Sequence, residues 1–157
     1  MTIRSLRKTE EDFSIGESLV KEYVHATARE MGIPNSEIVP YIEDYSNFPG
    51  KFWPDGDFLF LYSGQKVAGC VGITPGSDGF CEMNRLWIKP DFRRCGFGRK
   101  LILASLKRAK ELGFLRMGLD VLPTRKKAIE LYLSLGFRPC GPLHDYSFSM
   151  KSLDIEL

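Results

Sequence analysis

The stretch of sequence that decides the fold is Leu86-Trp87-Ile88-Lys89-Pro90-Asp91-Phe92-Arg93-Arg94-Cys95-Gly96-Phe97-Gly98-Arg99-Lys100-Leu101. A strand is expected to end at Pro90, and apolar residues at helical spacing predict a helix from Gly98 to Leu112. Between them, Gly96 and Gly98 allow the backbone to turn tightly and to approach a ligand closely. The free N–H groups that begin the helix point one way, and basic side chains flank them. Together they indicate an anion site, best matched by a phosphate or pyrophosphate.

Two common nucleotide-binding motifs do not fit this loop. A P-loop needs Gly-Lys followed by Ser or Thr, but Gly98 is followed by Arg99-Lys100-Leu101. A dinucleotide-binding fingerprint needs a third glycine three positions after the second, where this chain has Leu101. The loop therefore predicts a phosphate ligand of another kind.

Hydrophobic periodicity and turn residues place the other elements. A helix is expected to begin at the capping box Thr9-Glu10-Glu11-Asp12 and to stop near Gly32, and a second, short helix runs from Asn35-Ser36 to about Tyr45. Strands are expected over Thr2–Leu6, Phe58–Tyr62, Lys66–Ile73, Phe80–Lys89 and Leu115–Leu122. They are followed by a helix over Thr124–Leu135 and by a strand pair at Phe137 and at the alternating Tyr146, Phe148 and Met150. This order predicts a mixed α/β sheet.

Charge is unevenly distributed along the 157 residues. Residues 1–84 carry 7 Lys/Arg against 13 Asp/Glu, residues 85–127 carry 13 against 3, and residues 128–157 carry 2 against 4. The overall charge of +2 therefore hides a central segment of net +10. Such a segment indicates an anionic ligand, the alternative being a solvated helix face.

Composition excludes several classes of protein. With 43% hydrophobic and 27% charged residues the chain can bury an ordinary core, so disorder is excluded. The longest apolar run is Phe58–Tyr62, far short of the roughly 20 residues that span a bilayer. The N-terminus becomes charged too early for the apolar region of a signal peptide. We therefore expect a soluble, cytoplasmic protein that does not bind membranes.

No metal site is expected. The four cysteines include no C-x-x-C pair, and the two histidines, His25 and His144, are 119 positions apart. Zinc sites usually show clustered cysteine and histidine, so the cysteines are interpreted as reduced, mostly buried thiols.

Two motifs in register resemble the GNAT superfamily of acyl-CoA-dependent N-acyltransferases. Arg93-x-x-Gly96-x-Gly98 is similar to the pyrophosphate-binding signature of that family, and Ala128–Phe137 resembles its A-x-x-L-Y-x-x-x-G-F segment. The run Cys81–Leu86 further resembles uncharacterised bacterial members. The resemblance implies one N-acetyltransferase domain over residues 1–157. Its fold would be a single mixed, mostly antiparallel sheet flanked by helices, in which two central parallel strands splay apart.

The resemblance also implies how acetyl-CoA, the co-substrate, would be held. Backbone N–H groups of the loop and first helical turn would cradle its pyrophosphate, and Trp87 and Ile88 would pair with its pantetheine arm and polarise the acetyl carbonyl. The residues of that cradle are Arg93, Arg94, Cys95, Gly96, Phe97, Gly98, Arg99 and Lys100. The acetyl group would pass directly to a primary amine in a ternary complex, without a metal.

Two residues carry the proton transfers that the resemblance implies. Tyr132 stands at the family's general acid, the alternative being an aromatic residue packed in the core. Glu82 stands where some members have a general base, the alternative being a salt bridge, for instance with Arg85. Strand alternation places Glu82, Asn84, Leu86 and Ile88 on one face, so Glu82 and Arg85 share a pocket only if a bulge intervenes.

One position departs from the family pattern. An asparagine that contacts the pantetheine arm often precedes the alanine of the second motif by three residues, and here that residue is Arg125. Arg125, Lys126 and Lys127 could instead reach the phosphates of CoA, or form a solvated helix start. Cys95 would face the wrong end of the co-substrate for an acyl-enzyme nucleophile.

The acceptor side is expected to be acidic and aromatic. Residues that would line it are Glu30, Glu37, Glu43, Asp44, Asp55 and Asp57 with Tyr41, Tyr45, Phe48, Phe52 and Trp53. Such a surface favours a cationic amine, either a small molecule or a lysine or N-terminal amine of a protein, unless it is an ordinary solvated helix pair.

Two other functions remain open beside the enzyme. One is a regulatory protein that binds acyl-CoA but has no catalytic activity. The other is a nucleic-acid-binding module on the basic segment, which is disfavoured because few exposed aromatic residues accompany the charges. The sequence leaves the oligomeric state open, a homodimer included.

Overall fold

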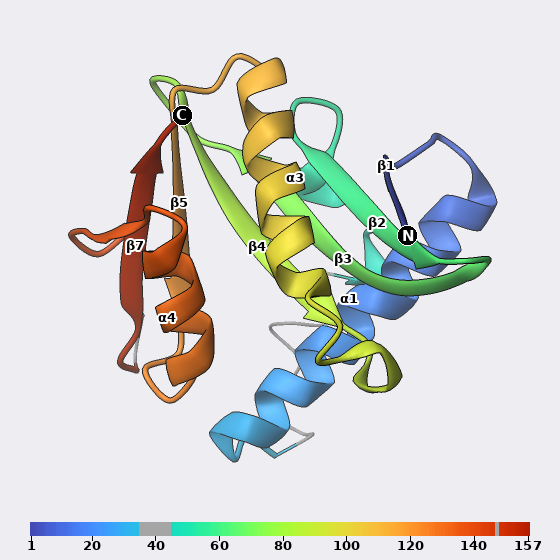
Figure 1. The fold of residues 1–157 in the computed structure, drawn as a ribbon, viewed down its shortest axis with the longest axis horizontal. Helices are drawn as coiled ribbons and strands as arrows, with labels where there is room; N and C mark the ends of the chain where they lie inside the picture. The colour runs from blue at the N-terminus through green and yellow to red at the C-terminus, as the bar shows by residue number, and fades with distance from the viewer. Residues whose placement is uncertain (35–44, 147) are drawn as a thin grey trace.

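The computed structural model describes residues 1–34, 45–146 and 148–157, which form one seven-stranded sheet in the order β1-β2-β3-β4-β5-β7-β6 (Figure 1). The strands are β1 (Thr2–Ser5), β2 (Asp57–Ser63), β3 (Lys66–Pro75), β4 (Phe80–Ile88), β5 (Arg116–Val121), β6 (Arg138–Pro139) and β7 (Lys151–Glu156). The helices of the described ranges are α1 (Glu10–Met31), α3 (Phe97–Glu111) and α4 (Lys126–Ser134), with 3-10 turns η2 (Gly50–Phe52) and η3 (Pro90–Phe92). Of the strand pairs in the described part of the chain, only β4 and β5 are parallel, so the predicted mixed, mostly antiparallel sheet is confirmed.

Two sequence predictions need comment. The expected helix from Asn35 lies almost wholly outside the described residues. The expected last strand over Tyr146–Met150 is wrong, because the strand that completes the sheet is β7, six residues that pair with β5 along its whole length. The described residues of 141–150 contain no strand, and two of them, Tyr146 and Met150, line the cavity described below.

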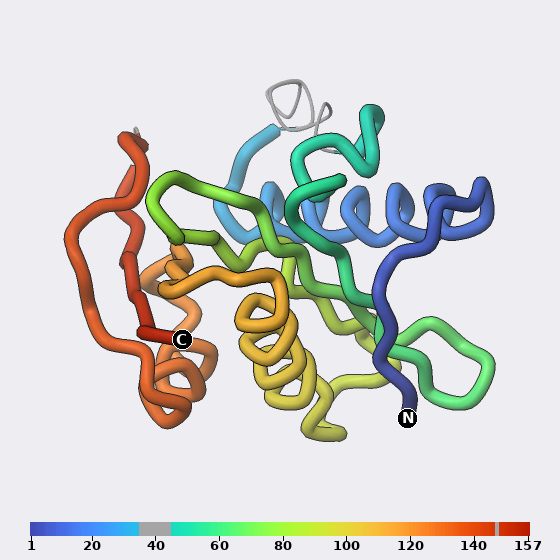
Figure 2. The backbone as a smooth tube through the Cα atoms, turned by 90° about the horizontal axis from the view of Figure 1, so that it is seen from above, coloured from blue at the N-terminus to red at the C-terminus, as the bar shows by residue number. Residues whose placement is uncertain are grey.

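Helices cover both faces of the sheet. Figure 2 shows α1 on one side of the strands and α3 on the other. Alternation along β2 serves both layers, because Phe58 and Phe60 pack with α1 whereas Leu59 and Leu61 belong to the cluster with α3 and α4. No helix of the described ranges is long and apolar enough to cross a membrane.

The start of α1 is fixed by a buried carboxylate. Thr9 caps the helix by accepting the N–H of Asp12 at 3.1 Å, as the capping box predicts. Asp12 is buried and accepts two hydrogen bonds from Arg4, at 2.7 and 2.8 Å, and others from Arg7. These bonds, from Arg4 above all, hold the pKa of the Asp12 carboxyl well below its usual range. The network ties α1 to β1 at the edge of the sheet.

The parallel strands β4 and β5 separate soon after they begin. Their register runs only from Phe80 opposite Arg116 to Glu82 opposite Gly118, although β4 continues to Ile88 and β5 to Val121. Beyond Glu82 the two strands diverge. Helix α4 lies on the same side of the sheet as α3 (Figure 2). The splayed central pair that the family resemblance implied is therefore present.

Candidate active site

A cavity of about 770 Å³ lies where β4 and β5 separate, and we call it the cleft. Its walls come from α1, β4, the start of α3, β5, α4 and the chain before β7. Six of the residues predicted to act in catalysis or co-substrate binding line it: Glu82, Trp87, Ile88, Arg93, Gly98 and Tyr132. The other predicted residues lie beside it, in the loop before α3 and the first turn of that helix: Arg94, Cys95, Gly96, Phe97, Arg99 and Lys100.

The loop that enters α3 has the geometry of an anion cradle. Arg94 and Gly96 both have positive φ, 64° and 75°, so the chain turns sharply before the helix starts at Phe97. No side chain caps the first N–H groups of α3. A Cβ built at Gly96 or Gly98 would meet nothing within 4 Å. Free donors, open space and the exposed basic side chains around them fit a pyrophosphate.

Arg93 contacts the end of β4 rather than the first turn of α3. Its Nε donates to the Ile88 carbonyl at 3.1 Å, and its guanidinium lies 4.8 Å from the centre of the Trp87 ring. Trp87 in turn donates its indole N–H to Glu22 of α1 at 3.0 Å. These contacts fix the segment of β4 that borders the cleft.

A bulge in β4 decides which side chains share the cleft. Gly72 pairs with Asn84 and Cys70 with Trp87, so two residues, Arg85 and Leu86, lie opposite one residue of β3. Arg85 has a φ of 56°. The predicted simple alternation is therefore wrong beyond Asn84, and Leu86 packs with the cluster on the α3 side while Trp87 packs with the one on the α1 side. As a result Glu82 and Arg85 both line the cleft.

Tyr132 belongs both to the core and to the cleft. It is 7% exposed and contacts Phe137 edge to face, with ring centroids 5.7 Å apart, yet it lines the cleft. Burial raises the pKa of its hydroxyl, and Tyr23 raises it further, so the phenol stays protonated at neutral pH. The two sequence interpretations, core aromatic and acid, are thus compatible.

Arg125 is held by α1. Its guanidinium donates to Glu30 Oε2 at 2.8 Å and to Thr27 Oγ1 at 3.1 Å, and it lies 5.8 Å from the centre of the Tyr23 ring. The hydrogen bonds from Arg125 lower the pKa of Glu30. Arg125 therefore closes one wall of the cleft, and the expectation that it reaches the CoA phosphates is not supported by its position.

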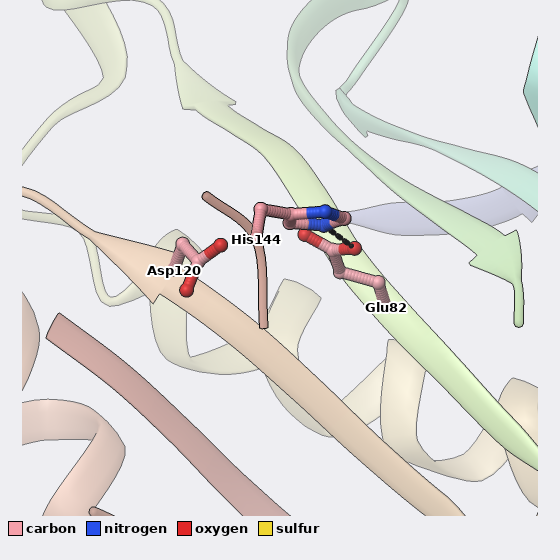
Figure 3. Close-up of side chains that lie close together, drawn as sticks. All are labelled: Glu82, Asp120 and His144. Atoms are coloured by element: carbon pink, nitrogen blue, oxygen red, sulfur yellow. Dashed lines mark hydrogen bonds and ion pairs between the residues drawn. The ribbon is translucent and has the colours of Figure 1, made fainter. Parts of the chain in front are cut away.

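A cluster that the sequence did not reveal lies at the point where the strands splay (Figure 3). His144 Nε2 is 2.7 Å from Glu82 Oε2, so the partner of Glu82 is His144 and not Arg85. Asp120 of β5 accepts hydrogen bonds from Tyr146 at 2.9 Å and from Ser152. Oxygen or nitrogen atoms of Glu82, Asp120 and His144 all lie within 4.8 Å of one another.

Hydrogen bonds account for the position of each member of this cluster, although three such groups could also hold a cation. The absence of a metal stays a prediction. One local signal for the cluster existed, because Asp120 is a charged residue between Leu119 and Val121 in β5. Nothing in the local sequence marks His144.

Several of the residues expected on the acceptor side serve the core instead, whereas Glu30 lines the cleft. Phe48, Phe52 and Trp53 pack with Phe58 in the cluster beneath α1. Asp57 is buried and bonds Arg108 at 2.6 Å. Residues expected there that lie outside the described ranges are Glu37, Tyr41, Glu43 and Asp44.

A second cavity of about 150 Å³ adjoins the cleft. Met31 and Phe148 give it apolar walls, and both cavities share Tyr23, Asp120 and Tyr146. It lies on the α1 side of the sheet.

The four cysteines are free thiols. Cys70 and Cys81 are buried, and burial raises the pKa of Cys81 to about 12. Cys95 is exposed in the loop before α3. Half of the cysteines are therefore fully buried rather than most.

Comparisons with known proteins agree with the fold. Residues 31–137 match the acetyltransferase (GNAT) family. An uncharacterised N-acetyltransferase of Dictyostelium discoideum is 37% identical over 87% of this chain and 88% of its own length, and one of Schizosaccharomyces pombe is 28% identical over 87% and 83%. The PaiA N-acetyltransferase of Thermoplasma acidophilum, solved with coenzyme A, has a TM-score of 0.75 over the full length of both chains at 21% identity.

A splayed parallel pair beside an anion cradle is the architecture of an acyltransferase. This chain belongs to the GNAT family of N-acyltransferases.

Proposed function

We propose that the protein is an N-acetyltransferase that transfers an acetyl group from acetyl-CoA directly to a primary amine in a ternary complex. The observation that carries this proposal is the cleft itself. It brings Glu82, Tyr132 and the end of β4 together with the first turn of α3 in one continuous cavity.

The donor side follows from the residues of the loop. The free N–H groups at the start of α3 bind the pyrophosphate, and the backbone of Trp87 and Ile88 contacts the pantetheine arm. Acetyl-CoA supplies a thioester, whose carbonyl carbon is open to attack and whose thiolate is the leaving group. The coenzyme A complex of the similar Thermoplasma protein supports this assignment.

The proton that the leaving group needs comes from Tyr132. Its hydroxyl stays protonated because it is buried, and it borders the cleft opposite the splayed strands. Donation of that proton to the departing sulfur is general acid catalysis. We place the deprotonation of the amine at the end of the cleft that Glu82 lines.

The acceptor is a cationic primary amine. The carboxylates of Glu82 and Asp120 line the cleft, and Asp120 also lines the smaller apolar cavity. The two carboxylates would hold an ammonium group close to them, beside Arg85 and Arg125, which line both cavities. An apolar substituent fits beside Met31 and Phe148. This arrangement favours an amine with a compact apolar portion over a long, purely polar one.

The experiment is a panel of amines at saturating acetyl-CoA with release of the CoA thiol as the readout. The panel contains phenethylamine, spermidine, a peptide with an N-terminal alanine and a peptide with an internal lysine. Turnover of at least one amine is expected, and phenethylamine should be used faster than spermidine. A silent acyl-CoA-binding protein would instead show a thermal shift with acetyl-CoA and no thiol release from any amine.

A further inference from the structure

We propose that His144, held by Glu82, is the group that takes the proton from the acceptor ammonium. This inference rests on the proposed function and identifies a catalytic residue for it. Glu82 becomes a positioning residue, which acts on the amine through the imidazole.

The placement of the pair favours this role. Glu82 is the last residue of β4 that pairs with β5, and its side chain is 17% exposed. His144 comes from the chain before β7, and its side chain is 51% exposed. The carboxylate lines the cleft, and the imidazole bonded to it is half exposed, so it can return a proton to water. Figure 3 shows the imidazole beside Glu82, over the point where the two strands separate.

Three segments hold the imidazole in one orientation. Glu82 of β4 bonds Nε2, and the Tyr146 ring lies edge to face with the imidazole at 5.8 Å. Tyr146 is itself fixed by its hydrogen bond to Asp120 of β5. Within the described ranges, the charged and titratable groups near the ring are Glu82, Asp120 and Tyr146, with Arg85 farther along β4 and Asp145 next in the chain. An ordinary surface ion pair needs no such support.

The chemistry of the amine explains why an imidazole is needed. An alkylammonium loses its proton near pH 10.4 in small peptides, a carboxylic acid near 4.3 and an imidazolium near 6.5. The pKa of a carboxylic acid is therefore about 6 below that of the ammonium, and the pKa of an imidazolium is about 4 below it. Proton transfer from the amine is less unfavourable to an imidazole than to a carboxylate. The imidazole is the better match.

The direction of the hydrogen bond defines the step. An ionised carboxylate only accepts, so Nε2–H donates to Glu82, and in the neutral imidazole the lone pair is then on Nδ1. One N–H bond of the ammonium breaks, its electron pair stays on nitrogen, and the proton forms a bond to Nδ1. The resulting imidazolium faces Glu82 and Asp120, and it then releases the proton to water. The amine is left neutral and nucleophilic.

The first arm of the test does not depend on activity. In protein labelled with ¹⁵N-histidine, the His144 Nε2–H should give a downfield proton signal, because its hydrogen bond slows exchange with water. Glu82→Ala should abolish that signal, whereas His25→Gln should leave it in place. The hydrogen bond between His144 and Glu82 is contradicted if the wild-type protein lacks this signal, or if the signal persists in Glu82→Ala.

The second arm measures kcat/KM against pH with phenethylamine or spermidine, whichever is used faster. His144→Gln should lower it by about 100-fold near neutral pH. The difference in kcat/KM between wild type and His144→Gln should shrink as the pH approaches the pKa of the amine. Added imidazole should restore activity to His144→Ala. His25→Gln should match wild type throughout.

The outcomes separate the two proposals. If kcat/KM of His144→Gln is lowered equally at every pH, or is not lowered, His144 is not the base, and the proposed acetyltransferase activity is unaffected. A wild-type protein that uses no amine of the panel removes the proposed function and the base role together, even if the Nε2–H signal is present.

Discussion

The Arg125 guanidinium and the Glu30 carboxylate form an ion pair in the wall of the cleft, with Nη2 and Oε2 2.8 Å apart. Arg125 stands immediately before α4 and Glu30 lies in the last turn of α1, so the contact joins helices on opposite faces of the sheet. It spans 95 positions of sequence. The cleft therefore has one wall made by an ion pair rather than by packing.

This pair should contribute measurably to stability. The two side chains are 27% and 35% exposed, so we expect a coupling free energy of about 0.5–1 kcal/mol from a double-mutant cycle of Glu30→Ala and Arg125→Ala. Urea unfolding of the four proteins measures it. Because Arg125 lowers the pKa of Glu30, the coupling is present above the unfolded pKa of about 4.3 and is lost as pH falls below it. Additive effects near neutral pH would contradict the prediction.

Tyr132→Phe should lower kcat by about 100-fold and leave the affinity for acetyl-CoA unchanged, because only the acidic hydroxyl is removed. The wild-type hydroxyl keeps its proton well above neutral pH, so the ratio of the two kcat values should be constant between about pH 7 and pH 9. Steady-state kinetics and calorimetric titration with acetyl-CoA provide both numbers.

Tyr62→Phe is the matched control for Tyr132→Phe, since Tyr62 lies in β2 and its hydroxyl accepts from Arg4. It should retain full activity. Equal kcat for wild type and Tyr132→Phe would remove the acid role.

Gly98→Asp should prevent binding of acetyl-CoA without unfolding the chain. A side chain at this position meets nothing within 4 Å, and an acidic residue in the first turn of α3 favours the helix. The same charge repels a pyrophosphate. At 100 times its Kd, acetyl-CoA should stabilise the wild-type protein by about 2.7 kcal/mol and the variant by almost nothing, as measured by thermal unfolding.

Leu103→Asp adds the same charge to the exposed side of α3 and should keep the wild-type response to acetyl-CoA. If Gly98→Asp is stabilised as much as the wild type, the anion cradle is assigned to the wrong loop.

Local signals explain what could be predicted from the sequence. Pro90 ends β4 and Gly96 precedes α3, because one residue lacks an N–H and the other adopts a positive φ. These effects act within a few residues, so the strand, loop and helix of the donor side were predicted closely.

The parts that escaped prediction depend on partners distant in sequence. The bulge at Arg85 arises from the pairing of β4 with β3, and it moves Leu86 to the other face. Glu82 and His144 are 62 positions apart and meet only because the chain before β7 returns to the splayed strands. Aromatic residues such as Phe52 show the same spacing in the sequence whether they pack in a core or line a ligand surface, so the sequence does not distinguish the two.

The network at Asp12 gives a prediction about stability and pH. Asp12→Asn should lower the free energy of unfolding by about 3 kcal/mol near neutral pH, because Arg4 and Arg7 lose a buried anionic partner. The folded pKa of Asp12 is depressed, so its contribution is present above the unfolded value of about 3.9 and is lost as pH falls below that value. Unfolding free energies of wild type and variant should therefore converge in acid.

Glu11→Gln is the matched control, since Glu11 is exposed in the same turn of α1, and its effect should stay within about 0.5 kcal/mol. Urea denaturation at a series of pH values measures all three proteins. A difference between wild type and Asp12→Asn that is as large in acid as at neutral pH would show that the variant acts through packing. In that case the two arginines would not be the cause of the stability that Asp12 provides.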